Sequence, residues 1–458
     1  MDIRSFISSS FINNNEGSVM GDFLIGVLGA GKSGVSCVNL ALKKGYRVIL
    51  SDVSENIKIE IKSHKNLIIE KGTHSRKLLD CDLIVISPGI SNDISIVKKA
   101  IKNKIDVISE IEFASWFTKS DIISVTGSNG KSTTVSLLNH IFLKAGYDSF
   151  LGGNIGTAFS ENVAHELNRK FKKPIHILEL SSFQIENLKK FKSKVSCIMN
   201  ISEDHLDRYE SLDHYIDTKL SLVNFSEKTI YNSGDKYIVS RLNQIYNDNT
   251  LEDIQCIYKI NANSIYCVNT KKDLISLDET KMMGCHNLFN IAFAFAVANL
   301  FDISDNVIIE AVRSFRPLKH RLEFVSLLNN IRYYNDSKST NIDSTVKALE
   351  SFNDSIVLIL GGINKGFDFN ELIPSLRFVE KIYAYGRSGK DITNNLKDII
   401  NIKYVKNFKE CVLSAIDFAN KSRNKNVLLS PACASFDQFE NYEERGDLFK
   451  QIVMEQVC

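Results

Sequence analysis

The sequence is poor in the features that would place a protein in a membrane, in an oxidising compartment or on a nucleic acid. Its longest apolar run, Ile291–Phe301, is about half of the roughly 20 residues that cross a bilayer. The nine cysteines are scattered, and no two stand in C-x-x-C spacing, which disfavours a disulfide framework and a cysteine-based zinc site. The 56 Lys and Arg nearly balance the 54 Asp and Glu, so no large nucleic-acid surface is indicated. We therefore expect a cytoplasmic protein with no membrane or nucleic-acid partner.

Proline is also scarce, with five in 458 residues, whereas 44% hydrophobic and 24% charged residues are ordinary for a globular protein. At roughly 150 residues per domain, the length predicts about three domains. The segment Met1–Met20 is rich in Ser and Asn and lacks the apolar stretch of a signal peptide. We interpret residues 1–21 as a disordered extension, because the first clear strand begins at Phe23.

Short apolar segments alternate with amphipathic ones along the rest of the chain, which predicts an α/β fold with parallel sheets. Three units recur, each opening with a strand and a polar or glycine-rich turn, and boundaries are expected near Phe117–Asp121 and Arg316–Leu318. Residues 230–285 show several short, weakly periodic segments and stay unassigned. The predicted domains are residues 22–117, 118–316 and 317–458.

The first glycine-rich turn, Gly29–Gly34, follows a predicted strand and matches G-x-G-x-x-G. Glycines there permit a tight turn and let backbone N–H groups approach a pyrophosphate at a helix N-terminus. Asp52 ends the next predicted strand, close to where an acidic ribose ligand lies in dinucleotide-binding folds. The pattern is typical of a NAD-dependent dehydrogenase domain. A plain tight turn in an α/β sheet is the alternative, and the motif does not say which nucleotide is bound.

The second turn, Thr126–Ser132, is more specific because it joins a strand to a helix and carries Gly-x-x-Gly-Lys-Ser. Such a loop directs several amides and the Lys131 ammonium towards phosphate oxygens. Ser132 is placed to coordinate a magnesium ion. The match to the general phosphate loop is imperfect, since Val125 replaces its first glycine. The alternative is a glycine turn with a solvated lysine.

Charged residues then follow two further predicted strands of the same unit. Glu179 stands at a strand end, where it could hold a divalent ion opposite Ser132, or be an ordinary strand-end carboxylate. The loop Asn200–Tyr209 crowds four charged groups around His205, which could be a metal ligand, a proton carrier or a structural histidine. Lys219 lies on a predicted helix and by itself carries no assignment.

Three turns of the last unit each follow a predicted strand, so we expect them on one edge of one sheet. Each is unremarkable singly, since Gly, Asn and Ser are common loop residues. Their convergence, with two lysines, predicts an anion site, and His320–Arg321 adds a cation at the domain interface. The three turns are Asn335–Asn341, Gly361–Gly366 and Ser430–Asp437.

Taken together, these motifs resemble the Mur ligase family of peptidoglycan synthesis, and most closely its D-glutamate-adding members, from about Phe23 to the C-terminus. The family-wide motifs are Thr126–Ser132, Glu179, His205, His286–Asn290 and His320–Arg321. The motifs of the D-glutamate-adding members are Ser87–Ile90, Glu179–Glu186, Glu203–Tyr209, Asn335–Asn341 and Ser430–Gly446. The Asp-Asn-Pro-Arg motif of the diaminopimelate- or lysine-adding ligases is absent from the sequence.

The resemblance implies three domains: a Rossmann-like N-terminal domain that holds UDP rather than NAD, a central P-loop ATPase-like domain, and a Rossmann-like C-terminal domain that brings the amino acid. It implies an ATP-dependent ligase of cell-wall biogenesis that phosphorylates the carboxylate of UDP-N-acetylmuramoyl-L-alanine. The amine of D-glutamate then attacks the acyl phosphate. ATP as substrate, two Mg²⁺ ions and a monomeric state are the accompanying expectations.

The resemblance also assigns roles to individual residues, with Lys131, His205 and Lys219 as the catalytic set and Lys219 acting as a carbamate. The expected metal ligands are Ser132, Glu179, His205 and Lys219. The expected ATP-binding residues are Gly127, Ser128, Asn129, Gly130, Lys131, Ser132, Thr133, Asn287, Asn290, Arg321 and Asp336. The expected UDP-substrate contacts are Gly31, Ser33, Gly34, Asp52, Ser87 and Asn154. The expected D-glutamate contacts are Thr340, Lys338, Lys365, Ser435 and Tyr442.

Three alternatives stay open at this point. A NAD-dependent dehydrogenase accounts for Gly29–Asp52 but leaves the phosphate loop and the C-terminal motifs without a role. A nucleotide-dependent switch accounts for Lys131 but predicts no amino-acid turnover. Another Mur or folylpolyglutamate-type ligase would use a different acceptor. Phosphate release from ATP, with and without both acceptor substrates, separates these possibilities.

Overall fold

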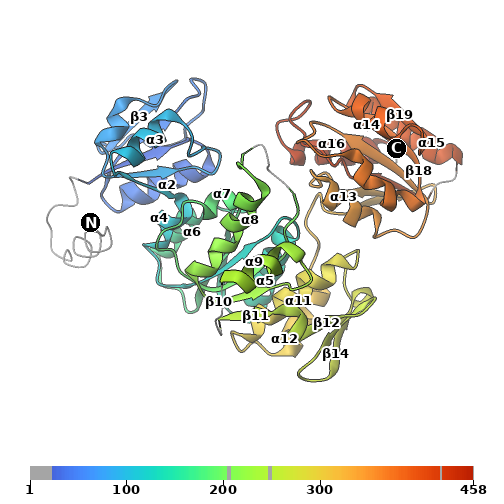
Figure 1. The fold of residues 1–458 in the computed structure, drawn as a ribbon, viewed down its shortest axis with the longest axis horizontal. Coiled ribbons are helices and arrows are strands. Elements are labelled where there is room, and N and C mark those ends of the chain that lie inside the picture. Colours follow the sequence, from blue (N-terminus) through green and yellow to red (C-terminus); the bar gives the residue numbers. More distant parts are fainter. Residues whose placement is uncertain (1–22, 204–207, 246–249, 423–424, 457–458) are drawn as a thin grey trace.

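The computed structural model describes residues 23–203, 208–245, 250–422 and 425–456. It has three α/β lobes, the N-terminal lobe (24–115), the central lobe (121–314) and the C-terminal lobe (323–455), and in Figure 1 the first and last lie at the upper left and upper right of the central one. The expected extension, residues 1–21, falls outside the described residues. Within the described ranges, no helix combines the length and the apolar character that crossing a membrane requires.

The N-terminal lobe is a parallel sheet in the order β3-β2-β1-β4-β5. Alternate residues of its inner strands face opposite layers: Leu83 and Val85 pack towards α2 and α4, whereas Ile84 and Ile86 pack towards α3. The strands are β1 (Leu24–Leu28), β2 (Arg47–Asp52), β3 (Leu67–Lys71), β4 (Leu83–Ile86) and β5 (Asp106–Ser109). The helices are α2 (Lys32–Lys43), η2 (Arg76–Asp80), α3 (Ser95–Lys102) and α4 (Glu110–Ser115).

The central lobe is a parallel sheet in the order β11-β10-β9-β6-β8-β7. Helices α5, α11 and α12 cover one face, and α6, α8 and α9 lie on the other. The strands are β6 (Asp121–Thr126), β7 (Asp148–Gly153), β8 (Pro174–Glu179), β9 (Ser193–Ile198), β10 (Ser226–Tyr231) and β11 (Leu251–Asp253). The helices are α5 (Lys131–Lys144), α6 (Phe159–Glu166), α7 (Ser182–Ile185), α8 (Leu212–Leu220), η3 (Ser221–Phe225), α9 (Lys236–Ile245), α10 (Ile254–Ile257), α11 (His286–Asn299) and α12 (Asp305–Ser314).

The segment 230–285, which had no clear pattern, supplies the edge of this sheet and a small antiparallel sheet of order β12-β13-β14. The small sheet buries Tyr258, Ile265 and Ile275 in the same core as α11. Its short strands alternate irregularly because of a register shift at Ile265/Tyr266. The elements are β12 (Tyr258–Ile260), β13 (Ser264–Cys267), β14 (Lys272–Ser276) and η4 (Leu277–Glu279).

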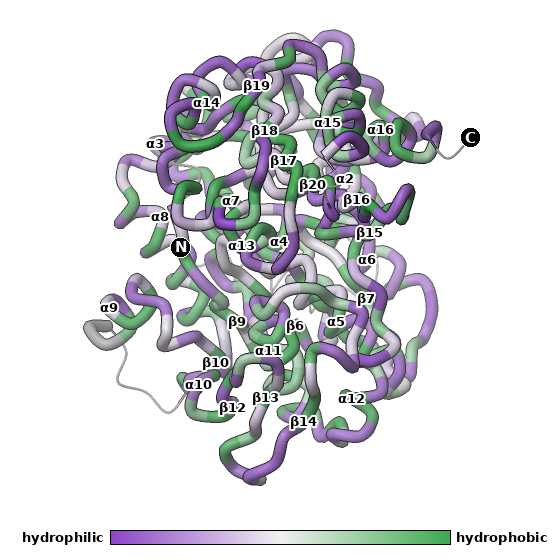
Figure 2. The backbone as a smooth tube through the Cα atoms, turned by 90° about the vertical axis from the view of Figure 1, so that its right-hand side faces the viewer, coloured by the Kyte–Doolittle hydropathy of each residue, from purple (hydrophilic) through white to green (hydrophobic). Residues whose placement is uncertain are grey.

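The C-terminal lobe has the strand order β15-β16-β20-β17-β18-β19, parallel except for the antiparallel edge strand β15. Its inner strand β17 is apolar throughout, as Figure 2 shows, because helices cover both faces of the sheet. The strands are β15 (Glu323–Leu328), β16 (Ile331–Asn335), β17 (Ile356–Gly361), β18 (Val379–Tyr385), β19 (Ile402–Val405) and β20 (Asn426–Leu429). The helices are α13 (Ile342–Leu349), η5 (Phe369–Phe378), α14 (Gly389–Leu396), α15 (Phe408–Ser422) and α16 (Tyr442–Glu455).

Candidate active site

The phosphate loop joins β6 to α5 and is held rigidly by the segment that follows β9. Gly127 (φ +151°) and Gly130 (φ +84°) have backbone angles that favour glycine. A Cβ on Gly130 would lie 2.5 Å from the Asn290 side-chain oxygen. The Asn129 N–H donates to Asn200 Oδ1 (2.8 Å), and Asn200 Nδ2 donates back to the Asn129 carbonyl (3.0 Å). The loop is therefore preorganised for an anion at the start of α5.

Lys131 and Lys219 converge on this loop from two helices. The Lys131 ammonium donates to the carbonyls of Gly127 (2.6 Å) and Ser128 (2.9 Å). Lys219, buried near the end of α8, donates to the same Gly127 carbonyl (3.0 Å) and lies 4.9 Å from the Tyr215 ring. Only the family resemblance gave Lys219 a role, and the helix places it against the loop. His205 lies outside the described residues.

Glu179 ends β8 beside the loop, with a fully buried carboxylate. Its Oε1 accepts from Asn154 Nδ2 (2.7 Å), its side chain also bonds Ser132, and its Oε2 has no hydrogen-bond partner. Burial alone would raise the pKa of Glu179, but the ammonium groups of Lys131 and Lys338 and these hydrogen bonds together hold it below the usual value. A charged carboxylate with a buried, unpartnered oxygen next to a serine hydroxyl is a suitable pair of ligands for a hard divalent cation.

Arg321 reaches the loop from the chain between the central and C-terminal lobes. Its guanidinium donates to Ser132 Oγ (2.8 Å), while its Nε is buried without a partner. The flanking residues His320 (φ +62°) and Leu322 (φ +43°) both have left-handed backbone angles, which cost energy in non-glycine residues. This turn persists because Asp336 Oδ1 accepts from the Leu322 N–H (3.1 Å) and the His320 carbonyl accepts from the Lys338 N–H (3.1 Å).

Lys338 and Asp336, from the turn after β16, complete the charged cluster. Lys338 lies 4.9 Å from the Tyr442 ring. Burial, followed by repulsion from Arg321, lowers the pKa of Lys338 to about 8. Burial raises the pKa of Asp336 to about 6, although its carboxylate accepts from Ser339, Ser430 and the Leu322 N–H. The clustered cations Lys131, Arg321 and Lys338 favour a polyanion in this space.

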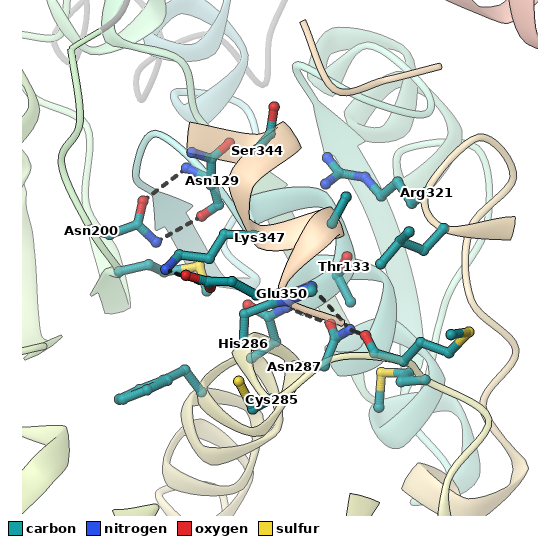
Figure 3. Close-up of a pocket in the computed structure, with 18 of the residues that line it drawn as sticks. Asn129, Thr133, Asn200, Cys285, His286, Asn287, Arg321, Ser344, Lys347 and Glu350 are labelled. Carbon is teal, nitrogen blue, oxygen red and sulfur yellow. Dashed lines mark hydrogen bonds and ion pairs between the residues drawn. The ribbon is translucent and has the colours of Figure 1, made fainter. Parts of the chain in front are cut away.

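A cavity of about 1310 Å³ opens beside this cluster, between α11 and α13 (Figure 3). Asn129 lies on one side of it, whereas His286 and Asn287 line it from α11 and Arg321 approaches from the linker (Figure 3). Asn287 Nδ2 donates to the Met283 carbonyl (2.7 Å), and Asn287 Oδ1 accepts from Asn290 Nδ2 (2.8 Å). Burial lowers the pKa of His286 to about 4. The cavity is also lined by the expected ATP residues Gly130, Thr133, Asn290 and Asp336.

In the N-terminal lobe, the turn after β1 is braced by side chains expected to face UDP. Gly29 has φ +91°, and a Cβ there would lie 2.8 Å from Ser87 Oγ. Asp52 Oδ2 accepts from the Ala30 N–H (2.7 Å), and Asp52 Oδ1 accepts from the Ser54 N–H (2.8 Å). The structure thus shows Asp52 orienting the turn, and its expected contact with the UDP ribose stays a prediction.

Comparison with known proteins adds a direct relationship. The sequence profiles of the Mur ligase middle domain and of the MurD-like N-terminal domain of Mur ligases match residues 125–298 and 24–109. A UDP-N-acetylmuramoylalanine--D-glutamate ligase of Christiangramia forsetii is 38% identical over 444 residues, covering 93% of this chain and 98% of the relative. One from Buchnera aphidicola is 39% identical over 441 residues, covering 94% and 97%. The chain belongs to the Mur ligase family.

The solved structures agree with this Mur ligase in fold. The UDP-N-acetylmuramate-alanine ligase MurC of Thermotoga maritima superposes with a TM-score of 0.61 at 18% identity, covering 94% of this chain and 99% of that one. The expected α/β architecture with a MurD-like first domain and a Mur ligase middle domain is confirmed. A dehydrogenase is not favoured, because the relatives matched along nearly the whole chain are ligases.

In the C-terminal lobe of this Mur ligase, the three expected turns lie on one edge, since β16, β20 and β17 are adjacent and parallel. Lys338 and Tyr442 meet there, and Ser435 is buried nearby in the turn after β20. Thr340 and Lys365 belong to the turns after β16 and β17 at the same edge, and their contacts with D-glutamate stay predictions.

Arg445 is the residue of this edge that sequence reasoning missed. It is fully buried on α16. Its guanidinium donates to Ser337 Oγ (2.8 Å), to the Ser337 carbonyl (2.6 Å), to Tyr385 Oη (3.1 Å) and to the Cys433 carbonyl (3.1 Å). One side chain thereby ties together segments that follow or end three different strands. Its only sequence signal was its place inside the long motif Ser430–Gly446.

Proposed function

We propose that this Mur ligase uses ATP to join D-glutamate to UDP-N-acetylmuramoyl-L-alanine in peptidoglycan precursor synthesis. The observation that carries the proposal is that relatives 34–39% identical over nearly their whole length bear the name of that ligase. The cavity between α11 and α13, with the phosphate loop at its side, is the proposed ATP site. The turn after β1 is the proposed UDP site, and the edge of β16, β20 and β17 is the proposed D-glutamate site.

The chain's own residues have mainly a positioning and electrostatic role in this chemistry. Lys131 would leave the loop carbonyls that it now contacts and donate to the β- and γ-phosphates. Arg321, held by its strained turn, would face the same phosphates across Ser132. The substrate carboxylate attacks the γ-phosphorus and ADP leaves. The D-glutamate amine then attacks the acyl carbon, so that phosphate departs and an amide bond forms.

Mg²⁺ suits the residues present, because Glu179 carries a buried unpartnered oxygen beside the Ser132 hydroxyl. When bound, the ion neutralises charge on the transferring phosphoryl group. Ser132 and Glu179 are the proposed ligands of one ion, and His205 and carbamylated Lys219 of a second. If Lys219 acts as a carbamate, Lys219→Ala should be nearly inactive and partly rescued by short carboxylic acids. A fully active Lys219→Ala variant would remove Lys219 from the proposal.

Acyl transfer needs the reacting atoms within roughly 3–3.5 Å, and the substrates are proposed to sit on three lobes. We propose that the C-terminal lobe closes on the central lobe about Arg316–Leu318, which would also exclude water from the acyl phosphate. Lys338 and Tyr442, which already lie close enough to act on Glu179 and Arg321, would stay directed to the phosphate loop, with Thr340, Lys365 and Ser435 around D-glutamate.

The test is phosphate release from ATP by the full chain with UDP-N-acetylmuramoyl-L-alanine and one amino acid at a time. Release that requires both the nucleotide sugar and D-glutamate is the expected result, with the amide product confirmed by mass spectrometry. L-Glutamate, L-alanine and L-lysine serve as matched acceptors. Turnover with one of these but not with D-glutamate would assign the chain to another Mur ligase specificity.

A further inference from the structure

A second strand–turn–helix segment of this protein repeats the spacing of the phosphate loop. Gly386-Arg387-Ser388-Gly389-Lys390 joins β18 to α14, as Gly127–Lys131 joins β6 to α5. Both read Gly-x-x-Gly-Lys after a buried strand, but the second has basic residues at two of its five positions. No residue of this turn takes part in the proposed ligase site. The position, rigidity and positive charge of the turn Gly386–Lys390 are therefore not explained by the ligase reaction.

The turn lies at a point where the connections of the C-terminal sheet change sides. The strand β18 leads to α14, which packs on the face of the sheet that also holds α13 and η5. Its neighbour β19 leads to α15, which packs on the opposite face with α16. Such a divergence opens a crevice at the carboxyl ends of the two strands, and ligands of open α/β sheets bind in crevices of this kind.

The turn is braced on three sides, so the crevice is a built feature. The Ser388 N–H donates to the Gly362 carbonyl (2.9 Å), and Ser388 Oγ accepts from the Asn364 N–H (2.8 Å). The Arg387 N–H donates to Asp437 Oδ2 (2.9 Å). Gly386 has φ +71°, and a Cβ there would lie 2.2 Å from that same oxygen. These contacts fix the backbone from which Arg387 and Lys390 project.

A cavity of about 790 Å³ occupies the crevice, and its charge is positive. Arg387, Lys390 and Lys406 line it together with one carboxylate, that of Asp437. All three cations are exposed, and within the described residues none of them forms an ion pair with a carboxylate. The Asp437 carboxylate is directed to the Arg387 backbone. Its second oxygen, Oδ1, has no hydrogen-bond partner, so this one carboxylate partly offsets the three cations and leaves an excess of positive charge at the cavity.

Two further features favour a phosphate over a bulky polyanion. The N-terminus of α14 has no side-chain cap, and although the Gly389 N–H donates to the Gly386 carbonyl (3.2 Å), the positive end of the helix lies at the cavity that Lys390 lines. Tyr404 forms a wall against the turn, with its ring packed so close that a Cβ on Gly389 would lie 2.6 Å from it. A compact tetrahedral oxyanion matches this combination of a helix N-terminus and cations.

We propose that this crevice, lined by Arg387, Lys390 and Lys406, binds a phosphate group, either free phosphate or the phosphate of a small organic ester. The site shares no lining residue with the large cavity beside the phosphate loop. It can therefore be tested whether or not the proposed ligase function holds.

The experiment is calorimetric titration of the full chain with inorganic phosphate and, separately, with ribose 5-phosphate. A nonhydrolysable ATP analogue is present at saturation so that the phosphate loop is filled. One bound phosphate per chain is expected. The triple variant Arg387→Gln/Lys390→Gln/Lys406→Gln should weaken binding about tenfold or more, because charge-assisted hydrogen bonds are lost. These side chains are exposed, so the melting temperature should not change.

The matched control is Lys397→Gln/Lys403→Gln/Lys425→Gln, which neutralises three exposed cations of the same lobe outside the crevice. It should bind phosphate as the wild type does. Ribose 5-phosphate binding at least tenfold tighter than inorganic phosphate would identify an organic ester as the ligand, whereas equal affinity would identify free phosphate. Failure of the wild type to bind either probe at millimolar concentration, or equal binding by both triple variants, would overturn the proposal.

Discussion

The central lobe contacts its two neighbouring lobes through different kinds of interaction. The junction with the N-terminal lobe is a continuous apolar core, in which Val48 and Leu83 of the first sheet share one cluster with Phe159 and Leu178 of the second lobe. The buried residues of the two C-terminal cores instead all belong to that lobe, and from the central lobe only the partly buried Met283 packs against one of them among the described residues. A cavity lined by residues of both lobes and a few hydrogen bonds, such as Arg321 to Ser132 and Asn129 to Asp343, join the C-terminal lobe to the central lobe.

This difference indicates which lobe moves. Separating the first two lobes would expose buried apolar surface, at roughly 25 cal/mol per Å², and would break buried hydrogen bonds to Glu112 and Glu110. Separating the last two lobes exposes polar groups that water can solvate, as in transient interfaces. We therefore infer that the N-terminal and central lobes act as one body and that the C-terminal lobe is the mobile part.

The largest effect is expected at the junction of the N-terminal and central lobes, called here the fixed junction, when its buried polar contacts are removed. Glu112 is fully buried and accepts from the N–H groups of Lys189, Lys190 and Phe191 and from Trp116 Nε1, at 2.8–2.9 Å. Glu112→Ala leaves these donors unpaired and should cost about 3–5 kcal/mol of unfolding free energy. Urea unfolding measures this loss. Glu112→Gln, which keeps one acceptor oxygen, should fall between wild type and Ala, and an unchanged Ala variant would contradict the fixed junction.

At the junction of the central and C-terminal lobes, called here the mobile junction, a substitution should lower activity and leave the stability of the fold unchanged. Lys131→Ala deletes a charge next to Gly127, Ser128 and Glu179, and should lower turnover about 10²–10³-fold. Its melting temperature should stay close to that of the wild type. Lys144→Ala, at the exposed far end of the same helix, is the control and should keep full activity. Near-native turnover by the Lys131 variant would exclude the proposed phosphate contact.

The pH dependence of the unfolding free energy provides a further test of the fixed junction, because Glu110 is buried there. Burial raises the pKa of Glu110, which accepts from the Ser160 N–H, to about 7. The pKa of Glu in the unfolded chain is about 4.3. Between that pH and pH 7, Glu110 is protonated in the folded state and ionised in the unfolded state, so its contribution to stability falls as pH rises. Relative to wild type, Glu110→Gln should gain up to about 3 kcal/mol between pH 4.5 and pH 8. Melting curves across this range, with exposed Glu161→Gln as control, test the sign; a constant difference would refute it.

The smallest effect is expected at the outer edge of the fixed junction, where Arg208 spans the two lobes. Its guanidinium lies 4.2 Å from the Phe183 ring and donates to the carbonyls of Pro88, Gly89 and Ile90 at 3.4–3.5 Å. Arg208→Ala should raise KM for the UDP substrate about threefold to tenfold, with little change in kcat. Arg208→Lys, which keeps the charge but not the fork, should lie between the two. A change in kcat alone would show that Arg208 does not act on the N-terminal lobe.

Predictions from sequence succeeded where one local pattern contained the whole signal. The inner strands β1, β6, β8 and β17 are apolar runs that end in turns, because both of their faces are covered. The edge strands β3 and β15 were not recognised. β3 exposes Ile68 and Ile69 and β15 exposes Phe324, so neither pattern distinguishes an inner from an outer face. The Gly-x-x-Gly-Lys spacing of Gly386–Lys390 is also visible in the sequence, but no site was predicted from it.

The sequence by itself determined the strand–turn–helix motifs at Gly29–Gly34 and Thr126–Ser132, because a glycine turn and its flanking apolar runs are contiguous in the chain. Tertiary structure alone decided which distant groups complete them. Asn200 clamps the phosphate loop, and Arg445 ties together three segments of the C-terminal lobe. The choice between a shared core and a polar hinge was likewise decided by packing, since burial depends on contacts between residues far apart in sequence.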